Sequence, residues 1–159
     1  MQESKKKILA VDDDEMHLYT VKQLLDSENI EVITHKSWLG VTNVLKSLQP
    51  DLLLLDINMP ALSGDRLSEL IRPYCEASSI PIIFYSSNDE ESLKKSVKKC
   101  NVAGYICKGD IKDLKAKVHH YLLSVYSAPI RAPIPVQFRH LFRCNSGHHS
   151  GPFRAASNA

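Results

Sequence analysis

The run Asp51-Leu-Leu-Leu-Leu-Asp56 constrains the fold more than any other stretch of this chain. Four successive leucines leave no polar face, so a strand formed here has to be covered on both sides. Such strands occur in parallel sheets that carry helices on both faces. The run therefore predicts a central strand of a parallel α/β sheet.

The rest of the sequence alternates short apolar runs with segments of helical period. The apolar runs predict five strands, over 6–11, 31–35, 51–56, 80–86 and 103–107. Apolar residues at helical spacing follow each run, and they are clearest over 111–125. We therefore expect five strand–helix units, (βα)5, in a single domain.

Charge divides the chain into two parts. All 18 acids lie within 1–126, whereas 127–159 holds four arginines and no acid. Three prolines, Pro129, Pro133 and Pro135, exclude regular structure at the start of the second part. We expect a folded domain over 1–126 and a linker or disordered tail over 127–159. Nucleic-acid binding is not expected of the acidic main part.

No apolar stretch approaches the ~18 residues that a membrane helix needs. The three lysines at 5–7 precede only four apolar residues, which is too few for a signal peptide. We expect a cytoplasmic protein that does not bind membranes.

Polar residues stand at the downstream ends of four predicted strands. They are Asp12 with Asp13, then Asp56, Ser86 and Lys108. The carboxyl ends of parallel strands share one edge of the sheet, where ligands bind. Three acids, a hydroxyl and an ammonium at one edge predict a site for a divalent cation and a phosphoryl group.

The chemistry of these groups supports that prediction. Clustered carboxylates repel one another, and Mg²⁺, a hard cation that binds oxygen, removes the repulsion; Mn²⁺ is a possible substitute. Asp56 could then attack phosphorus and form an acyl phosphate, while Ser86 and Lys108 neutralise the developing charge. The purely structural alternative is that Asp12 and Asp13 cap the first helix, since Asp is a good N-cap.

These residues form an ordered set of short motifs. The motifs are Val11-Asp12-Asp13, Asp56-Ile57-Asn58-Met59-Pro60 with Gly64, Ser86, and Gly104-Tyr105-Ile106-Cys107-Lys108. With them, residues 5–125 resemble the receiver domain of bacterial two-component response regulators. The resemblance implies a doubly wound, flavodoxin-like sheet of five parallel strands in the order 2-1-3-4-5.

The resemblance also implies a role for each residue of the site. Asp56 would be the phosphoacceptor, and Mg²⁺ would be bound by Asp13, Asp56 and the Asn58 carbonyl, with Asp12 acting through metal-bound water. Ser86 would bind the phosphoryl group and Lys108 would pair with it. Tyr105 would be a rotameric switch that turns inward as the Ser86 hydroxyl moves toward the phosphate.

Partners follow from the same resemblance. The donor would be a phosphohistidine on a sensor histidine kinase or a histidine phosphotransfer protein. An effector, not identified by the sequence, would bind the face formed by the fourth helix, the fifth strand and the fifth helix. The domain would be a monomer or a phosphorylation-dependent dimer. Such a domain turns over no external substrate, so we do not expect an enzyme. We expect the lysines of that face, Lys117 among them, to form a solvated surface.

One departure and one rival remain. Gly109 replaces the proline that usually follows the lysine in this family, which keeps open a degenerate receiver that acts as a phosphate-independent binding module. The rival is a Mg²⁺-dependent aspartate-nucleophile phosphohydrolase of the haloacid-dehalogenase type. Asp12 and Asp14 match its acidic pair, but Met16 stands where Thr or Val belongs.

Overall fold

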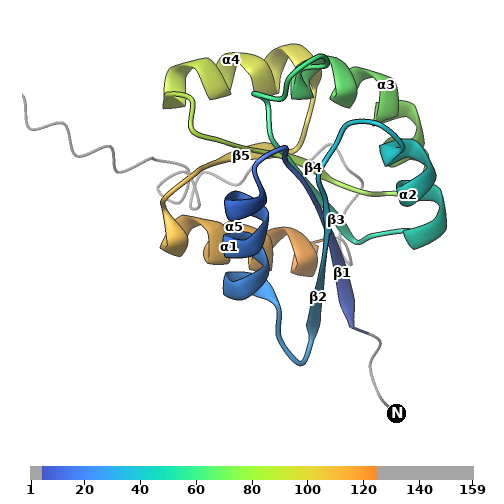
Figure 1. Cartoon of the computed structure of the whole chain (residues 1–159), viewed down its shortest axis with the longest axis vertical. Coiled ribbons are helices and arrows are strands. Elements are labelled where there is room, and N and C mark those ends of the chain that lie inside the picture. The colour runs from blue at the N-terminus through green and yellow to red at the C-terminus, as the bar shows by residue number, and fades with distance from the viewer. Residues whose placement is uncertain (1–4, 125–159) are drawn as a thin grey trace, which may run out of the picture.

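Figure 1 shows a computed structural model of the chain, in which residues 5–124 are described. The strands are β1 (Lys6–Val11), β2 (Ile30–His35), β3 (Leu52–Leu55), β4 (Ile82–Ser86) and β5 (Gly104–Cys107). The helices are α1 (Glu15–Leu25), α2 (Val41–Leu48), α3 (Gly64–Ala77), α4 (Glu90–Cys100) and α5 (Ile111–Ser124). The tail predicted over 127–159 lies outside the described residues.

The strands form one parallel sheet in the order β2-β1-β3-β4-β5. This confirms the predicted doubly wound, flavodoxin-like (βα)5 fold with strand order 2-1-3-4-5. Strands β3, β4 and β5 are shorter than their predicted segments by one to two residues, because an apolar run marks where a strand lies better than where its hydrogen-bonded ladder ends.

Helices cover both faces of the sheet. Figure 1 shows α1 and α5 on one face and α2, α3 and α4 on the other. The leucines of β3 alternate between the two resulting cores: Leu52 and Leu54 face the α1 and α5 side, and Leu53 and Leu55 face the other. All four are at most 1% exposed, as their unbroken apolar sequence predicts.

Strand register brings the polar residues to one level. Val11 pairs with Leu55, so Asp12 and Asp56 leave the sheet side by side, and the Asp56 N–H donates to the Val11 carbonyl at 2.9 Å. On the other side of β4, the Lys108 N–H donates to the Ser86 carbonyl, also at 2.9 Å. Backbone pairing between the strands therefore sets the level of the sheet at which each site residue follows its strand.

Gly64 keeps the loop after β3 close to the site. Its N–H donates to the Ile57 carbonyl at 2.9 Å, and α3 begins at this glycine. A Cβ added to Gly64 would lie 2.0 Å from the Asp56 carbonyl oxygen. Only a residue without a side chain allows this approach of α3 to the end of β3.

The predicted helical stripes are correct except at their edges. Leu70 and Ile111 belong to predicted stripes but are 69% and 50% exposed. The expectation that Lys117 lies on a solvated lysine surface is wrong, because its side chain is fully buried. None of the helices within residues 5–124 has the length and apolar character to cross a membrane.

Candidate phosphoryl and metal site

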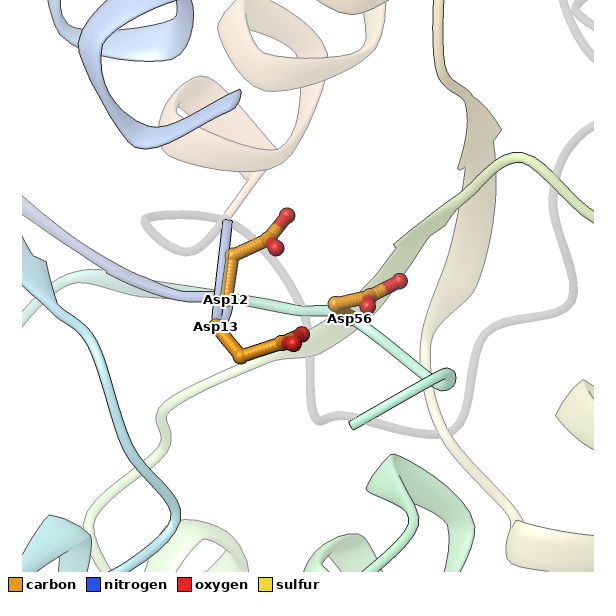
Figure 2. Close-up of side chains that lie close together, drawn as sticks. All are labelled: Asp12, Asp13 and Asp56. Carbon is orange, nitrogen blue, oxygen red and sulfur yellow. The ribbon is translucent and has the colours of Figure 1, made fainter. Parts of the chain in front are cut away.

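Three carboxylates gather at the carboxyl edge of the sheet (Figure 2). One oxygen each of Asp12, Asp13 and Asp56 lies within 4.8 Å of the others. Asp12 and Asp56 are 4% and 3% exposed, whereas Asp13 is exposed. The cluster thus combines two buried acids with one that reaches solvent.

The helix-cap alternative for Asp12 and Asp13 does not hold, because Asp14 is the N-cap of α1. Its Oδ1 accepts the Met16 N–H at 2.8 Å. Asp12 uses Oδ1 to accept the Asp14 N–H at 2.9 Å, and its Oδ2 lies in the site. The second acid of the phosphohydrolase-type pair, Asp14, is therefore occupied in capping a helix.

Lys108 is the cation of the site. Its Nζ lies 2.7 Å from Asp12 Oδ2 and 3.3 Å from Asp56 Oδ1, and the side chain is 8% exposed. Both distances are those of ion pairs, and the two buried oxygens have no hydrogen-bond donor other than this ammonium among the described residues. One ammonium faces three carboxylates, and the site carries excess negative charge.

This imbalance changes the acidity of Asp56. Burial raises the pKa of its carboxyl, and the neighbouring Asp12 adds to that rise. The ammonium of Lys108 and the Asn58 backbone N–H act in the opposite direction without cancelling the rise. The folded protein therefore holds the charged form of Asp56 in an unfavourable environment, which a bound cation would relieve.

The Ser86 hydroxyl oxygen accepts two hydrogen bonds. Asn58 Nδ2 donates to it at 3.2 Å, and the Asn88 backbone N–H donates at 3.4 Å. Asn58 Nδ2 also donates to Asn88 Oδ1 at 2.7 Å, which links the loops after β3 and β4. Ser86 is fully buried, so its oxygen is held at a fixed place beside the acids.

Gly109, which follows Lys108, has φ of +95°. Proline cannot adopt this value, because its ring fixes φ near −65°. The loop after β5 therefore follows a path that the usual proline would exclude, while Lys108 still reaches the acids.

The side chain of Tyr105, in β5, is buried and held by contacts with α4 and α5. The residue is 5% exposed, and its hydroxyl donates to Glu90 Oε1 on α4 at 3.0 Å. Lys117 Nζ lies 4.7 Å from the ring centroid and donates to the Tyr105 carbonyl at 2.9 Å. Burial, with the Glu90 contact, raises the pKa of the phenol, so it stays protonated as a donor.

Two residues near the site, His17 and Asn88, were not among the predicted site residues, and Lys117 was expected on the surface. Lys117 had a usable signal, because it falls between Leu114 and Tyr121 on the buried stripe of α5. His17 lies in the first turn of α1, three residues after the cap, and its Nδ1 is 3.0 Å from Lys108 Nζ. Nothing in the local pattern links these two residues, which are 91 positions apart.

The donor set fits Mg²⁺. Three carboxylates each offer an oxygen within 4.8 Å of the others, and two of those side chains have a buried oxygen with no hydrogen-bond donor other than Lys108 among the described residues. Carboxylate oxygens at one open edge, part buried and part exposed, suit a hard cation that keeps some of its water. Asn58, two residues after Asp56, lies in the loop between β3 and α3.

The strand order and the acid cluster define a flavodoxin-like domain with an acidic centre at the carboxyl edge of its sheet. The model of the response regulator receiver domain matches residues 8–119. The chain belongs to this receiver family of two-component signalling.

Individual relatives agree. The polar-differentiation response regulator DivK of Brucella ovis is 28% identical over 94 residues, which cover 57% of this chain and 76% of DivK. Protein RcaC of Microchaete diplosiphon is 29% identical over 102 residues, which cover 64% of this chain but only 16% of RcaC. A CheY-like receiver domain protein from Methanospirillum hungatei has a TM-score of 0.68 at 25% identity, covering 77% of this chain and 98% of that one.

Proposed function

We propose that this chain accepts a phosphoryl group on Asp56 from a phosphohistidine of a sensor histidine kinase or a histidine phosphotransfer protein. The observation that carries this proposal is the cluster of Asp12, Asp13 and Asp56 around a single lysine. Buried, mutually repelling acids destabilise a fold, so their presence at the ligand-binding edge of the sheet favours a functional role.

The transfer forms one bond and breaks another. A carboxylate oxygen of Asp56 bonds to phosphorus, giving an acyl phosphate, while the P–N bond of the phosphohistidine breaks. The donor imidazole leaves with the bonding electron pair and takes a proton from solvent. The step needs Asp56 ionised, and a cation bound beside its carboxylate favours the ionised form.

Asp12, Asp13, Asp56 and the Asn58 carbonyl would hold Mg²⁺, or Mn²⁺ in its place. The bound cation would neutralise the carboxylates and attract the incoming phosphoryl oxygens. Lys108 already lies 3.3 Å from Asp56 Oδ1, where its ammonium can pair with a phosphoryl oxygen. The Ser86 hydroxyl, held by Asn58 and Asn88, supplies a second group for the same purpose.

Phosphorylation would be read at the face of α4, β5 and α5. Movement of the Ser86 hydroxyl toward the phosphoryl group would change the packing of Tyr105, the proposed switch on the next strand. Helices α4 and α5 expose six lysines, Lys94, Lys95, Lys98, Lys99, Lys112 and Lys115. The first two pair with Glu90 and Glu91 of α4, and Lys99 lies beside Asp65 of α3. The charge of the lysines favours an acidic effector surface.

In this role the protein would act in the cytoplasm as a switch and not as an enzyme that turns over a substrate. It would work as a monomer or as a dimer that forms on phosphorylation. A degenerate receiver that binds its partner without phosphate is the second candidate, favoured by the altered backbone at Gly109.

The test is the intact mass of the protein after incubation with acetyl phosphate and Mg²⁺. We expect one added phosphoryl group on the wild type, none on Asp56→Asn, and none when the metal is chelated. Asp14→Asn is the matched control, because Asn also caps helices and Asp14 lies outside the metal-ligand set. It should label like the wild type.

An unlabelled wild type, under conditions where another receiver is labelled, would overturn the phosphoacceptor role. That outcome would leave the family and fold intact and would favour the phosphate-independent binding module. Labelling of Asp56→Asn would show that a different residue accepts the phosphoryl group.

A further inference from the structure

The Lys108 ammonium has a contact that neither the phosphoacceptor role nor the metal site accounts for. Besides Asp12 and Asp56, it lies 3.0 Å from Nδ1 of His17, in the first turn of α1. The Lys108 side chain is 8% exposed and that of His17 is 40% exposed. The contact therefore joins a nearly buried cation to a ring that borders solvent.

The chemistry of the two groups sets the condition for a hydrogen bond between them. An ammonium has donors and no acceptor, so it can hydrogen-bond only to a ring nitrogen that carries a lone pair. The 3.0 Å contact is a hydrogen bond when Nδ1 of His17 is unprotonated and the ring proton is on Nε2. In that tautomer His17 is a neutral acceptor.

A neutral acceptor matters because the other two partners of Lys108 have competing roles. Asp12 belongs to the acid cluster that would hold the cation, and Asp56 is the group that would be phosphorylated. The next residue, Gly109, is a glycine and does not restrict the backbone as a proline would, and the long lysine stem loses considerable rotamer freedom when it is held. The side chain of His17 provides Lys108 with a contact to a group that would bind neither the metal ion nor the phosphoryl group.

We propose that His17 is a positioning residue for the phosphoryl transfer: as a neutral acceptor, its Nδ1 holds the Lys108 ammonium beside Asp56. This inference rests on the proposed function. The same Nδ1 of His17 also lies 3.6 Å from Asp12 Oδ2 and 3.5 Å from Asp14 Oδ2, two acids that a protonated Nδ1 would contact in place of Lys108. Loss of the acceptor would leave Lys108 free to settle on Asp12 alone and would remove it from the place where phosphoryl charge develops.

Two substitutions separate the acceptor from the bulk of the ring. Asn places Oδ1 at the same number of bonds from Cα as Nδ1 of His17, whereas Leu fills similar space without an acceptor. At saturating Mg²⁺, we expect His17→Leu to slow labelling of Asp56 by acetyl phosphate about tenfold, the size expected for one hydrogen bond to a charged group. His17→Asn should recover the wild-type rate to within about twofold.

A second measurement does not depend on labelling. The ring-nitrogen NMR spectrum of His17, recorded at about pH 8 where histidine is normally neutral, should show an unprotonated Nδ1. Its resonance should shift in Lys108→Met, which has no ammonium to donate. Urea unfolding of each variant would show whether a slower rate merely reflects a damaged fold.

Labelling of His17→Leu at the wild-type rate would overturn the proposal, as would a His17 Nδ1 resonance that is the same in wild type and Lys108→Met. If the wild type itself were not labelled, the phosphoacceptor role would fail. The NMR comparison would then decide by itself whether His17 holds Lys108.

Discussion

Two buried lysines, Lys108 after β5 and Lys117 in α5, have very different surroundings. Lys108 pairs with Asp12 and Asp56 of the three-carboxylate cluster at the sheet edge, and the two buried oxygens that it contacts have no other hydrogen-bond donor among the described residues. Lys117 is fully buried in a hydrogen-bonded ion pair with Asp113 Oδ2 at 2.6 Å and donates to the Tyr105 carbonyl. The charges of Glu90 and Asp110 also act on this ammonium. The first arrangement has more carboxylates than ammonium groups, and the second is built around one direct pair, which we call the balanced pair.

The difference indicates what each lysine does. A matched buried pair holds structure together only as long as both partners stay, because removal of one leaves the other charge buried alone. An unmatched cluster weakens the fold and favours binding of something that restores the balance. We therefore expect opposite responses when charges are removed at the two places.

The largest effect should come from breaking the balanced pair. Lys117→Met leaves Asp113 buried without its partner and should lower the free energy of unfolding by about 3–5 kcal/mol, as measured in urea. Lys115→Met, on the exposed side of the same helix, is the control and should change it by less than about 0.5 kcal/mol. Similar values for the two variants would show that the pair contributes little.

A double variant sharpens this prediction. Lys117→Met with Asp113→Leu removes both charges and should recover most of the lost stability, because apolar side chains of similar volume can replace a buried ion pair. No recovery would point to the Lys117 contacts with Tyr105 as the main contribution.

The next largest effect should come from binding of a cation that neutralises the acid cluster. Mg²⁺ at about 100 times its dissociation constant should raise the free energy of unfolding by about 2.7 kcal/mol, the value that linkage gives for one site. Asp13→Asn should lose most of this increment. Asp51→Asn, at the other end of β3, should keep it, and an equal loss in both variants would argue against a site at the carboxyl edge.

Removing one charge from the unbalanced cluster should stabilise the protein in the absence of metal. Asp56→Asn should raise the free energy of unfolding at about pH 7 by about 0.5–2 kcal/mol, the usual gain from one stabilising substitution. It relieves the burial of a carboxylate and its repulsion by Asp12. Unfolding in urea, with and without the substitution, measures the gain.

The sign of the pH dependence follows from the raised pKa of Asp56. Because the folded protein holds the Asp56 proton more tightly than the unfolded chain does, this residue disfavours folding as pH rises from the ordinary value of 3.8 through the raised pKa. The gain from Asp56→Asn should therefore be absent below 3.8 and appear above it. At Asp14 the Met16 N–H lowers the pKa of the carboxyl, so Asp14→Asn should not stabilise.

The smallest effect should come from a matched pair that is not buried. Lys95 and Glu91 on α4 lie 3.2 Å apart, with side chains 75% and 80% exposed. Replacing both by Gln should change the free energy of unfolding by no more than about 0.5 kcal/mol, and added salt should reduce even that. A change as large as that of Lys117→Met would mean that burial is not what separates the two pairs.

The fold was predictable because its signals are local. The unbroken leucine run of β3 can only be a strand covered on both faces, and the acids, the serine and the lysine that follow strands must share an edge once the sheet is parallel. Pattern and spacing along the chain therefore predicted both the (βα)5 fold and the place of the site.

Details of the site were less predictable. Lys117 lies on the buried stripe of α5, but its charge predicted a place in solvent. Its pairing with Asp113 and its hydrogen bond to the Tyr105 carbonyl make the buried position tolerable. The contact of Asn58 with Asn88 joins two loops whose sequences are not periodic. Asp14 was one of three successive aspartates, and local backbone geometry selected it as the helix cap.

The sequence by itself determined the order of strands and helices along the chain, which faces of them are apolar, and which chemical groups reach the carboxyl edge. These follow from periodicity and from residue type at strand ends. The tertiary structure alone decided that His17 meets Lys108 and that Lys117 lies beneath Tyr105. Such contacts depend on register and side-chain direction between elements distant in sequence or packed across a sheet edge, and no local pattern encodes them.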